Sequence, residues 1–299
     1  MKRKITRLTL RNNSYLLGER TWLMGILNVT PDSFSDGGRF LSPERAIEHG
    51  LQMVEQGADI IDIGGESSRP GSNPVTAEEE VERILPVIKG LRKQTNCFLS
   101  VDTTKAYVAQ QALDEGVDII NDISAGRFDP EILPLAKKYR ATVILMHMKG
   151  QPKTMQINPV YENLLEEIGQ FFSERISGAQ KLGFDSSQLI IDPGIGFGKT
   201  FNHNLLLLNY LDYFQRFSAP LLVGVSRKSF IGEIVEQPPE KRLAGTIGAC
   251  LAAIVRGAHI LRVHDVQPIK EAIQVAEKIF NTHFSSPKEN KHEKESYVH

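Results

Sequence analysis

The sequence predicts an α/β protein whose strands and helices form a closed (β/α)8 barrel. Eight short apolar runs alternate with eight amphipathic helical patterns over about 260 of the 299 residues. Strict alternation of strand and helix implies parallel strands, and eight units of this total length favour a closed barrel. An open doubly wound sheet is the alternative. The barrel is favoured because no first strand–helix turn carries a GxGxxG fingerprint, while nearly every strand end carries polar groups.

The elements follow in order along the chain. Residues 5–21 alternate apolar and polar side chains around a turn at 11–14, which predicts a β-hairpin ahead of the barrel. The eight strands are predicted at 22–28, 59–63, 97–102, 118–122, 142–146, 189–192, 221–225 and 259–263. The helical patterns fall at 42–56, 77–93, 104–114, 131–139, 160–182, 203–217, 241–256 and 268–281. No linker interrupts this series, so we expect one domain over 1–284. The charged stretch 285–299 is nearly free of aliphatic residues and is predicted to be a disordered tail.

Composition excludes several classes of function. The formal net charge of -1 gives no basic footprint for nucleic acid, and no run reaches the roughly 18 apolar residues of a membrane span. The two cysteines, Cys97 and Cys250, have no CxxC spacing, which argues against a zinc site or a disulfide framework. No apolar region follows the basic N-terminus, so no secretory signal is predicted. We expect a cytoplasmic protein.

Polar side chains stand at or just after the end of every predicted strand. In a barrel these ends converge on one pocket. A single such residue is as often structural as functional. The structural interpretation suits Asp62 and Asp122, which lie inside or beside their strands. All eight ends together predict a ligand site. Its candidate residues are Asn28, Asp62, Gly64–Gly71, Asp102, Asn121, Asp122, His147, Asp192, Lys228, Arg262, His264 and Asp265.

The residue types of this set point to a particular ligand chemistry. Asp102, Asn121 and Asp192 offer acceptors that suit a flat heterocycle with several N–H donors, and carboxylates make the stronger, charge-assisted bonds. Cationic or donor groups suit an anion such as phosphate; they are Ser68, Arg69, Lys228, Arg262 and His264. The amide oxygen of Asn28 is a reasonable ligand for a hard metal such as Mg²⁺. Together they predict group transfer to or from a heterocyclic phosphoester.

Two further motifs have simpler interpretations. The GIGFGKT stretch at 194–200 ends like a phosphate-binding loop but is one residue short of GxxxxGK[ST]. It is predicted to be a glycine turn that lets Asp192 and Phe197 face the pocket. The methionines on either side of His147 could bind a soft metal, but methionine at a strand end usually contributes packing.

Taken together, eight motifs over residues 22–281 resemble the dihydropteroate synthase family of the folate pathway. The motifs are LNVTPDSFSDGG, DIGGESSRPG, SVDTTK, NDISAG, MHMKG, DPGIGFGKT, GVSRKSF and RVHDV. The resemblance implies a TIM barrel, usually a homodimer, that uses Mg²⁺. It also implies a transferase that condenses 6-hydroxymethyl-7,8-dihydropterin pyrophosphate with p-aminobenzoate by an SN1-like route. Sulfonamides, which mimic p-aminobenzoate, should compete with that substrate.

The same resemblance implies roles for individual residues of this chain. Pterin would be bound by Asp102, Asn121, Met146, Asp192, Phe197, Lys228 and Arg262. Pyrophosphate would be held by Asn28, Ser68, Arg69, Arg262 and His264, with Asn28 also touching the metal. p-Aminobenzoate would be bordered by Phe34, Pro70, Lys228 and Ser229. Catalysis would depend on Asp36, Arg69, Asp102 and Lys228. Ser68 departs from the threonine common in the family but keeps its hydroxyl.

Two other functions share part of this pattern. A methyltetrahydrofolate:corrinoid methyltransferase would use the same pterin acceptors, but it has no need of a pyrophosphate cradle. The stretches Arg262-x-His264 and Ser226-Arg227-Lys228-Ser229 therefore argue against it. A non-catalytic pterin-binding homologue should have lost loop residues that are present here. We therefore predict the synthase. The loop at 31–40, where Gly37 and Gly38 allow the backbone to swing, is predicted to be a lid that is poorly ordered without ligands.

Overall fold

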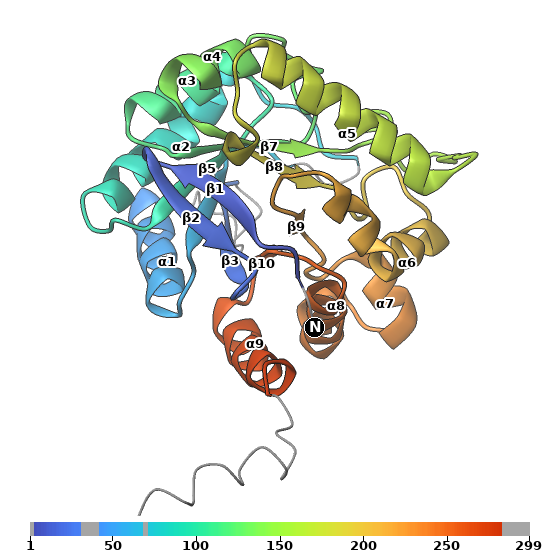
Figure 1. The fold of residues 1–299 in the computed structure, drawn as a ribbon. Coiled ribbons are helices and arrows are strands. Elements are labelled where there is room, and N and C mark those ends of the chain that lie inside the picture. The colour runs from blue at the N-terminus through green and yellow to red at the C-terminus, as the bar shows by residue number, and fades with distance from the viewer. Residues whose placement is uncertain (1–2, 31–41, 68–70, 283–299) are drawn as a thin grey trace, which may run out of the picture.

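The structure, a computed structural model, describes residues 3–30, 42–67 and 71–282. Within these ranges the chain forms a barrel of parallel strands surrounded by helices, with a small hairpin across one end (Figure 1). The fold predicted from the sequence is therefore confirmed. The expected lid at 31–40 and the expected tail at 285–299 lie outside the described residues.

Eight parallel strands make up the barrel, in the spatial order β8-β7-β6-β5-β4-β3-β10-β9. An isolated parallel bridge between Ile191 and Leu221 joins β8 to the start of β9, and the Ile191 N–H donates to the Pro220 carbonyl at 3.0 Å. This contact closes the circle. The strands are β3 (Trp22–Asn28), β4 (Ile60–Gly64), β5 (Phe98–Asp102), β6 (Ile119–Asp122), β7 (Thr142–Met146), β8 (Leu189–Asp192), β9 (Leu222–Val223) and β10 (Ile260–Val263).

Helices follow the strands and cover the outside of the barrel (Figure 1). They are α1 (Pro43–Glu55), α2 (Ala77–Arg92), α3 (Ala106–Asp114), α4 (Ile132–Tyr139), α5 (Leu164–Lys181), α6 (Phe201–Asn209), α7 (Ser229–Val235), α8 (Leu243–Val255) and α9 (Val266–Phe280). The short 3-10 helices are η1 (Ser186–Gln188), η2 (Leu211–Arg216) and η3 (Pro239–Lys241).

The predicted helix at 203–217 is wrong in extent. The α-helix ends at Asn209, and the chain continues as η2 after Tyr210, whose backbone is not helical. Leu211 and Phe214 are fully buried and three residues apart, and a 3-10 helix of three residues per turn directs both into the core. The seven-residue α7 was missed because two turns are too short to show a helical period.

The inside of the barrel is apolar at the amino ends of the strands. Inward-facing residues alternate with outward-facing ones, as the pleat requires. The hairpin of β1 (Thr6–Leu10) and β2 (Asn13–Leu17) contributes Leu8, Leu10 and Leu17 to this interior cluster. Its barrel members are Trp22, Met24, Ile60, Ile119, Ile144, Ile190, Leu222 and Ile260. The hairpin thus plugs the amino end, so the polar residues of the barrel interior gather at the carboxyl end.

Ion pairs fix the hairpin to this end of the barrel. The Arg11 guanidinium donates to both carboxylate oxygens of Asp118, just before β6, at 2.6 and 2.9 Å. Arg92 at the end of α2 donates to the same carboxylate at 3.0 Å. Asp118 also accepts from the Leu99 N–H at 2.9 Å, so it joins hairpin, strand and helix. No helix in the part of the chain described here is long and apolar enough to span a bilayer.

Candidate functional site

The strand register brings three predicted site residues to one level of the barrel. Asn28 pairs with Gly64, Gly64 with Asp102, and Asp102 with Asn121, across the four neighbouring strands β3 to β6. Paired residues of parallel strands face the same side, here the interior. A Cβ atom at Gly64 would lie 3.8 Å from both Asn28 Oδ1 and Asp102 Oδ2. The missing side chain therefore leaves the Asn28 amide and the Asp102 carboxylate facing a common space.

Arg262, at the end of β10, connects the acidic groups. Its Nε donates to Asp62 Oδ2 at 2.6 Å, and its Nη2 donates to Asp102 Oδ2 at 2.7 Å. The Nδ2 group of Asn121 donates to the same Asp62 oxygen at 2.9 Å. The sequence suggested that Asp62 was structural, but its side chain faces the barrel interior and links two predicted site residues.

Asp192 and Lys228 complete the polar group from the other side. Asp192 ends β8, and its Oδ1 accepts from the Gly194 N–H at 2.7 Å. Lys228 precedes α7, and its Nζ lies 4.2 Å from the centroid of the Phe197 ring, a cation–π distance. Ser229, the first residue of α7, is exposed beside it.

Burial shifts the ionisation of these groups toward neutral pH. Desolvation raises the pKa of Asp102 to about 7, although the charge of Arg262 acts in the opposite direction. Desolvation also raises the pKa of Asp192 to about 6. For Lys228, burial and then the charge of Arg262 lower the pKa to about 8. Groups with pKa values near neutral pH can gain or lose a proton easily when a ligand binds. Such shifted pKa values are common at functional sites.

A separate apolar cluster stands beside the polar groups. It consists of Ile123, Met146, Met148 and Met155, with Phe197 packed against it. Met146 and Phe197 were both predicted to line the site, and the structure brings them into one cluster. An apolar wall next to several convergent acceptors is the usual make-up of a site for a small flat molecule.

His264 enters the site without a charge. Its Nδ1 lies 2.9 Å from the Ser226 hydroxyl. Burial and the charge of Arg262 lower the pKa of His264 to about 3, so the ring is neutral at physiological pH. It can offer a hydrogen bond to an anion but no positive charge. Ser226 was predicted only as part of the pyrophosphate cradle at 226–229, and its contact with His264 was not predicted.

Three strand-end residues do not join this group, so the expectation that all of them converge was wrong. Asp122 accepts from backbone N–H groups of its own loop, at Ser124 and Gly126. Asp265 is paired with Arg227 at 2.6 Å. His147 contacts Lys199 and the ring of Phe171 in α5. Side chains alternate in direction along a β-strand. Because Asn121 faces inward, its neighbour Asp122 must face away from the interior.

Lys199 is a buried group that the sequence analysis missed. Its Nζ donates to the carbonyl oxygens of Phe197 at 2.9 Å and His147 at 3.3 Å, and it lies 3.0 Å from His147 Nδ1. Burial lowers its pKa well below the usual value. These bonds tie the loop after β8 to the loop after β7. The sequence signal was the GKT ending, which we interpreted only as a backbone turn.

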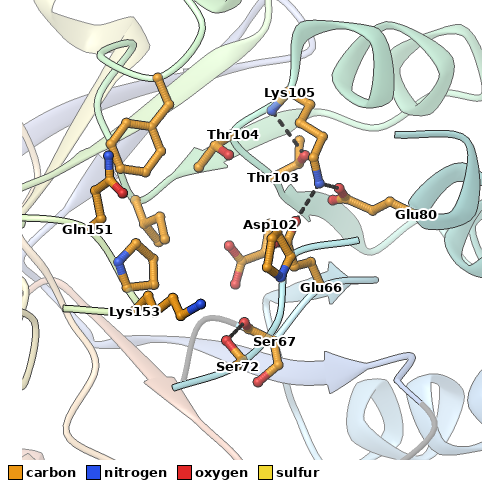
Figure 2. A pocket seen from close by; sticks show the side chains of 14 residues that line it. Glu66, Ser67, Ser72, Glu80, Asp102, Thr103, Thr104, Lys105, Gln151 and Lys153 are labelled. Atoms are coloured by element: carbon orange, nitrogen blue, oxygen red, sulfur yellow. Dashed lines mark hydrogen bonds and ion pairs between the residues drawn. The ribbon is translucent and has the colours of Figure 1, made fainter. Parts of the chain in front are cut away.

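A cavity of about 340 Å³ adjoins the polar group (Figure 2). Figure 2 shows the Asp102 side chain directed into this space, with Gln151 and Lys153 on the opposite side. On its wall, Lys105 bridges Glu66 and Glu80, at 2.6 Å from Glu80. Of the residues described as lining it, Asp102, Glu66 and Ser67 belong to the predicted candidates. The cavity therefore extends the site toward the loops after β4 and β7. Phe34, Asp36, Ser68, Arg69 and Pro70 lie outside the described residues, and their roles stay predictions.

The chain matches known proteins over nearly all of the barrel. The family model for pterin binding enzymes matches residues 24–264. A dihydropteroate synthase from Synechocystis sp. is 50% identical over 264 residues, which cover 88% of this chain and 91% of that relative. The structure of Xanthomonas albilineans dihydropteroate synthase with 4-aminobenzoic acid has a TM-score of 0.87 and 43% identity, covering 94% of this chain and 100% of that one. The Yersinia pestis dihydropteroate synthase in a sulfonamide drug complex has a TM-score of 0.86 and 43% identity, with 92% and 98% covered.

Gly194→Ala should destabilise the fold. Gly194 has φ +69°, and an added Cβ would lie 2.0 Å from the His147 carbonyl oxygen, so the two loops would be forced apart. The left-handed backbone alone costs a non-glycine residue about 1–2 kcal/mol, and we expect a larger loss of unfolding free energy by urea denaturation. Gly178→Ala, in an open position within α5, is the matched control and should not destabilise. Equal stability of the two variants would contradict the close approach.

Proposed function

This chain belongs to the family of pterin binding enzymes, and from that premise we propose that it makes 7,8-dihydropteroate. Its substrates are 6-hydroxymethyl-7,8-dihydropterin pyrophosphate and p-aminobenzoate, and pyrophosphate is released. The observation that supports this most directly is the convergence of Asp102, Asn121 and Asp192 beside Arg262. The names of its relatives support the same activity.

The acceptors suit the pterin ring. Asn121 uses its amide nitrogen on Asp62, so its amide oxygen faces the site as an acceptor. Together with the carboxylates of Asp102 and Asp192, it can receive the N–H groups on the edge of the ring. Met146 and Phe197 supply apolar contact to the ring face.

The donors proposed for the leaving group lie beside these acceptors. Arg262 supplies positive charge, and neutral His264 donates a hydrogen bond to a pyrophosphate oxygen. Ser68 and Arg69, on the loop after β4, add further donors in this proposal. As the leaving oxygen gains negative charge, these donors stabilise it more strongly than they stabilise the ground state.

Mg²⁺ is the proposed cofactor, with Asn28 as its protein ligand. In the described ranges no group of three His, Cys, Asp or Glu side chains is placed to hold a metal. A single amide oxygen still fits, because Mg²⁺ keeps several waters and takes most other ligands from phosphate. Asn28 faces the same space as Asp102, whose carboxylate contacts Arg262, a proposed donor to the pyrophosphate. When bound, the ion would neutralise charge on the pyrophosphate.

The chemistry proposed is dissociative. The C–O bond breaks with its electron pair going to pyrophosphate, and the CH₂ group shares its positive charge with the conjugated ring. Asp102 and Asp192 stabilise this cation, assisted by Asp36 on the loop after β3. The amine of p-aminobenzoate then attacks to form the C–N bond, and its surplus proton passes to water or to the released pyrophosphate. The amine needs position rather than a strong base because it is uncharged near neutral pH. Lys228 and Ser229 border this substrate in the proposal, with Phe34 and Pro70.

We further propose that the protein is a cytoplasmic homodimer. Both cysteines are free, which suits a reducing compartment. The outer helices α8 and α9 carry the exposed apolar side chains Val255, Val275 and Ile279, which a second copy would cover. Sedimentation equilibrium should give twice the chain mass, and a monomer at micromolar concentration would contradict the proposal.

The direct test of the function uses the full chain. The protein is incubated with the pterin pyrophosphate, p-aminobenzoate and Mg²⁺, and dihydropteroate is measured by liquid chromatography. Product well above a heat-inactivated control is expected. Absence of product from folded protein would show the proposal to be wrong.

Asp102→Asn should nearly abolish turnover. The change keeps the size of the side chain but removes a charged acceptor, and hydrogen bonds to charged groups contribute roughly 1.5–3 kcal/mol each. We expect kcat/KM for the pterin substrate to fall about a hundredfold or more if two such bonds weaken. Asp118→Asn, at the other end of the barrel, is the matched control and should leave kcat/KM near wild type. Wild-type kinetics in Asp102→Asn would reject its role.

The pH dependence should follow the strand-end carboxyl groups. Because the pKa of Asp102 is raised to about 7 and that of Asp192 to about 6, both lose their acceptor charge as pH falls. We therefore expect kcat/KM for the pterin substrate to decrease below about pH 7. The pyrophosphate substrate also titrates, so Asp102→Asn serves as the control and should lose most of this limb. A profile that is the same in both proteins would contradict the assignment.

A further inference from the structure

We propose that Asp62 is a positioning residue of the pterin site, which holds Arg262 and Asn121 in their working orientations through one carboxylate oxygen. The inference rests on the proposed function, because its consequences are for pterin binding. The sequence placed this residue among the site candidates but favoured a structural role for it.

The first support is the geometry of the contacts. Asp62 is completely buried, and its Oδ2 accepts both from Arg262 Nε at 2.6 Å and from Asn121 Nδ2 at 2.9 Å. Its other oxygen, Oδ1, is buried without a hydrogen-bond partner among the described residues. A buried carboxylate with one empty oxygen is costly for stability, so the residue is better explained by what it holds.

The position of Asp62 shows that it acts through other residues. Asp62 pairs with Ser100, whereas Gly64 pairs with Asp102 and Asp102 with Asn121. It therefore lies one inward-facing layer deeper in the barrel than Asp102 and Asn121.

One consequence concerns the amide of Asn121. A carboxylate paired with a guanidinium offers only acceptors, so Asn121 must present its NH₂ group to Asp62. Its carbonyl oxygen is then fixed on the ligand side, as the N–H donors of a pterin require. Without the charge at Asp62, the Asn121 amide can rotate by half a turn. Its NH₂ group would then face the N–H donors of the pterin.

The other consequence concerns Arg262. Its Nε contact with Asp62 and its Nη2 contact with Asp102 are separate bonds. The N–H donors of the pterin ring compete with Arg262 for Asp102. Pterin binding therefore displaces the Arg262–Asp102 bond but leaves the Arg262–Asp62 bond in place. Asp62 then keeps the guanidinium at the site while its Nη groups turn to the pyrophosphate.

Asp62 also influences the charge of Asp102. The groups that act on Asp102 are Arg262, which favours ionisation, and Asp62, Glu80 and Asp122, which oppose it. The negative charge of Asp62 thus helps to raise the pKa of Asp102 to about 7. Removing that charge should lower the pKa of Asp102 and move the acid limb of kcat/KM to lower pH.

The test compares Asp62→Asn with the matched control Asp118→Asn. Asp118 is also a buried aspartate paired with arginine, but it lies at the amino end of the barrel. For each protein we would measure folding by circular dichroism, pterin pyrophosphate binding by calorimetry, and the kinetics with each substrate varied. Asp62→Ser is the second variant, since its smaller side chain removes the charge and leaves room for water.

The expected result separates the two aspartates. Asp62→Asn should raise the Kd and KM for pterin pyrophosphate about ten- to a hundredfold, the range for a lost hydrogen bond to a charged group. The KM for p-aminobenzoate should change less than about threefold, and the acid limb should move to lower pH. Asp118→Asn should lower thermal stability but leave the pterin Kd and the pH profile unchanged.

Other outcomes would overturn the proposal. A wild-type pterin Kd and an unmoved acid limb in folded Asp62→Asn would show that Asp62 positions nothing needed for binding. Failure of both Asp62 variants to fold, with Asp118→Asn folded, would make the residue structural. Because binding is measured without turnover, these results are distinct from failure of the proposed function, in which the wild-type protein itself makes no dihydropteroate.

Discussion

The ion pairs of Arg262 with Asp62 and Asp102 determine how the rest of the site is arranged. Burial removes water from two carboxylates that lie close together, and an uncompensated buried charge is costly. The guanidinium, placed between them at 2.6 and 2.7 Å, supplies the compensating charge. Buried pairs of this kind rarely add stability over apolar packing, so their presence here points to function.

The barrel can hold this charge because its two ends have opposite character. The hairpin leucines and the inward-facing residues of the lower strands form an apolar plug. Outward-facing strand residues pack against the helices in the main core. The inward-facing residues at the carboxyl end are thus not needed to pack this main core. Gly64 extends this freedom, because its missing side chain opens the space shared by Asn28 and Asp102.

The sequence could predict the parts that depend on local periodicity. Strand–helix alternation predicted the barrel, and alternation of apolar and polar residues predicted the hairpin. It could not predict where the 203–217 helix stops, because burial of Leu211 and Phe214 in the tertiary core decides that point. The five predicted ligands Asp102, Asn121, Asp192, Lys228 and Arg262 do gather at the carboxyl end of the barrel.

The errors in the site have a common physical origin. A polar residue at a strand end faces in or out according to a single residue of register. Asp122 therefore caps its own loop while Asn121 faces the site. The same rule gives Asp62 an inward direction, two residues before Gly64, although the sequence favoured a structural role for it. Lys199 was missed for another reason, since its partners are carbonyl oxygens that no sequence pattern reveals.

Under the proposed function, Arg262 would connect recognition of the ring with recognition of the leaving group. In the free protein its Nη2 occupies Asp102, the acceptor that a pterin ring would need. A ring that takes this acceptor leaves the guanidinium short of one anionic partner, and a pyrophosphate on the same molecule can replace it. Under the proposed function, ring and pyrophosphate therefore assist each other's binding through one side chain. The guanidinium that pairs with the two carboxylates is then the same group that stabilises the departing pyrophosphate.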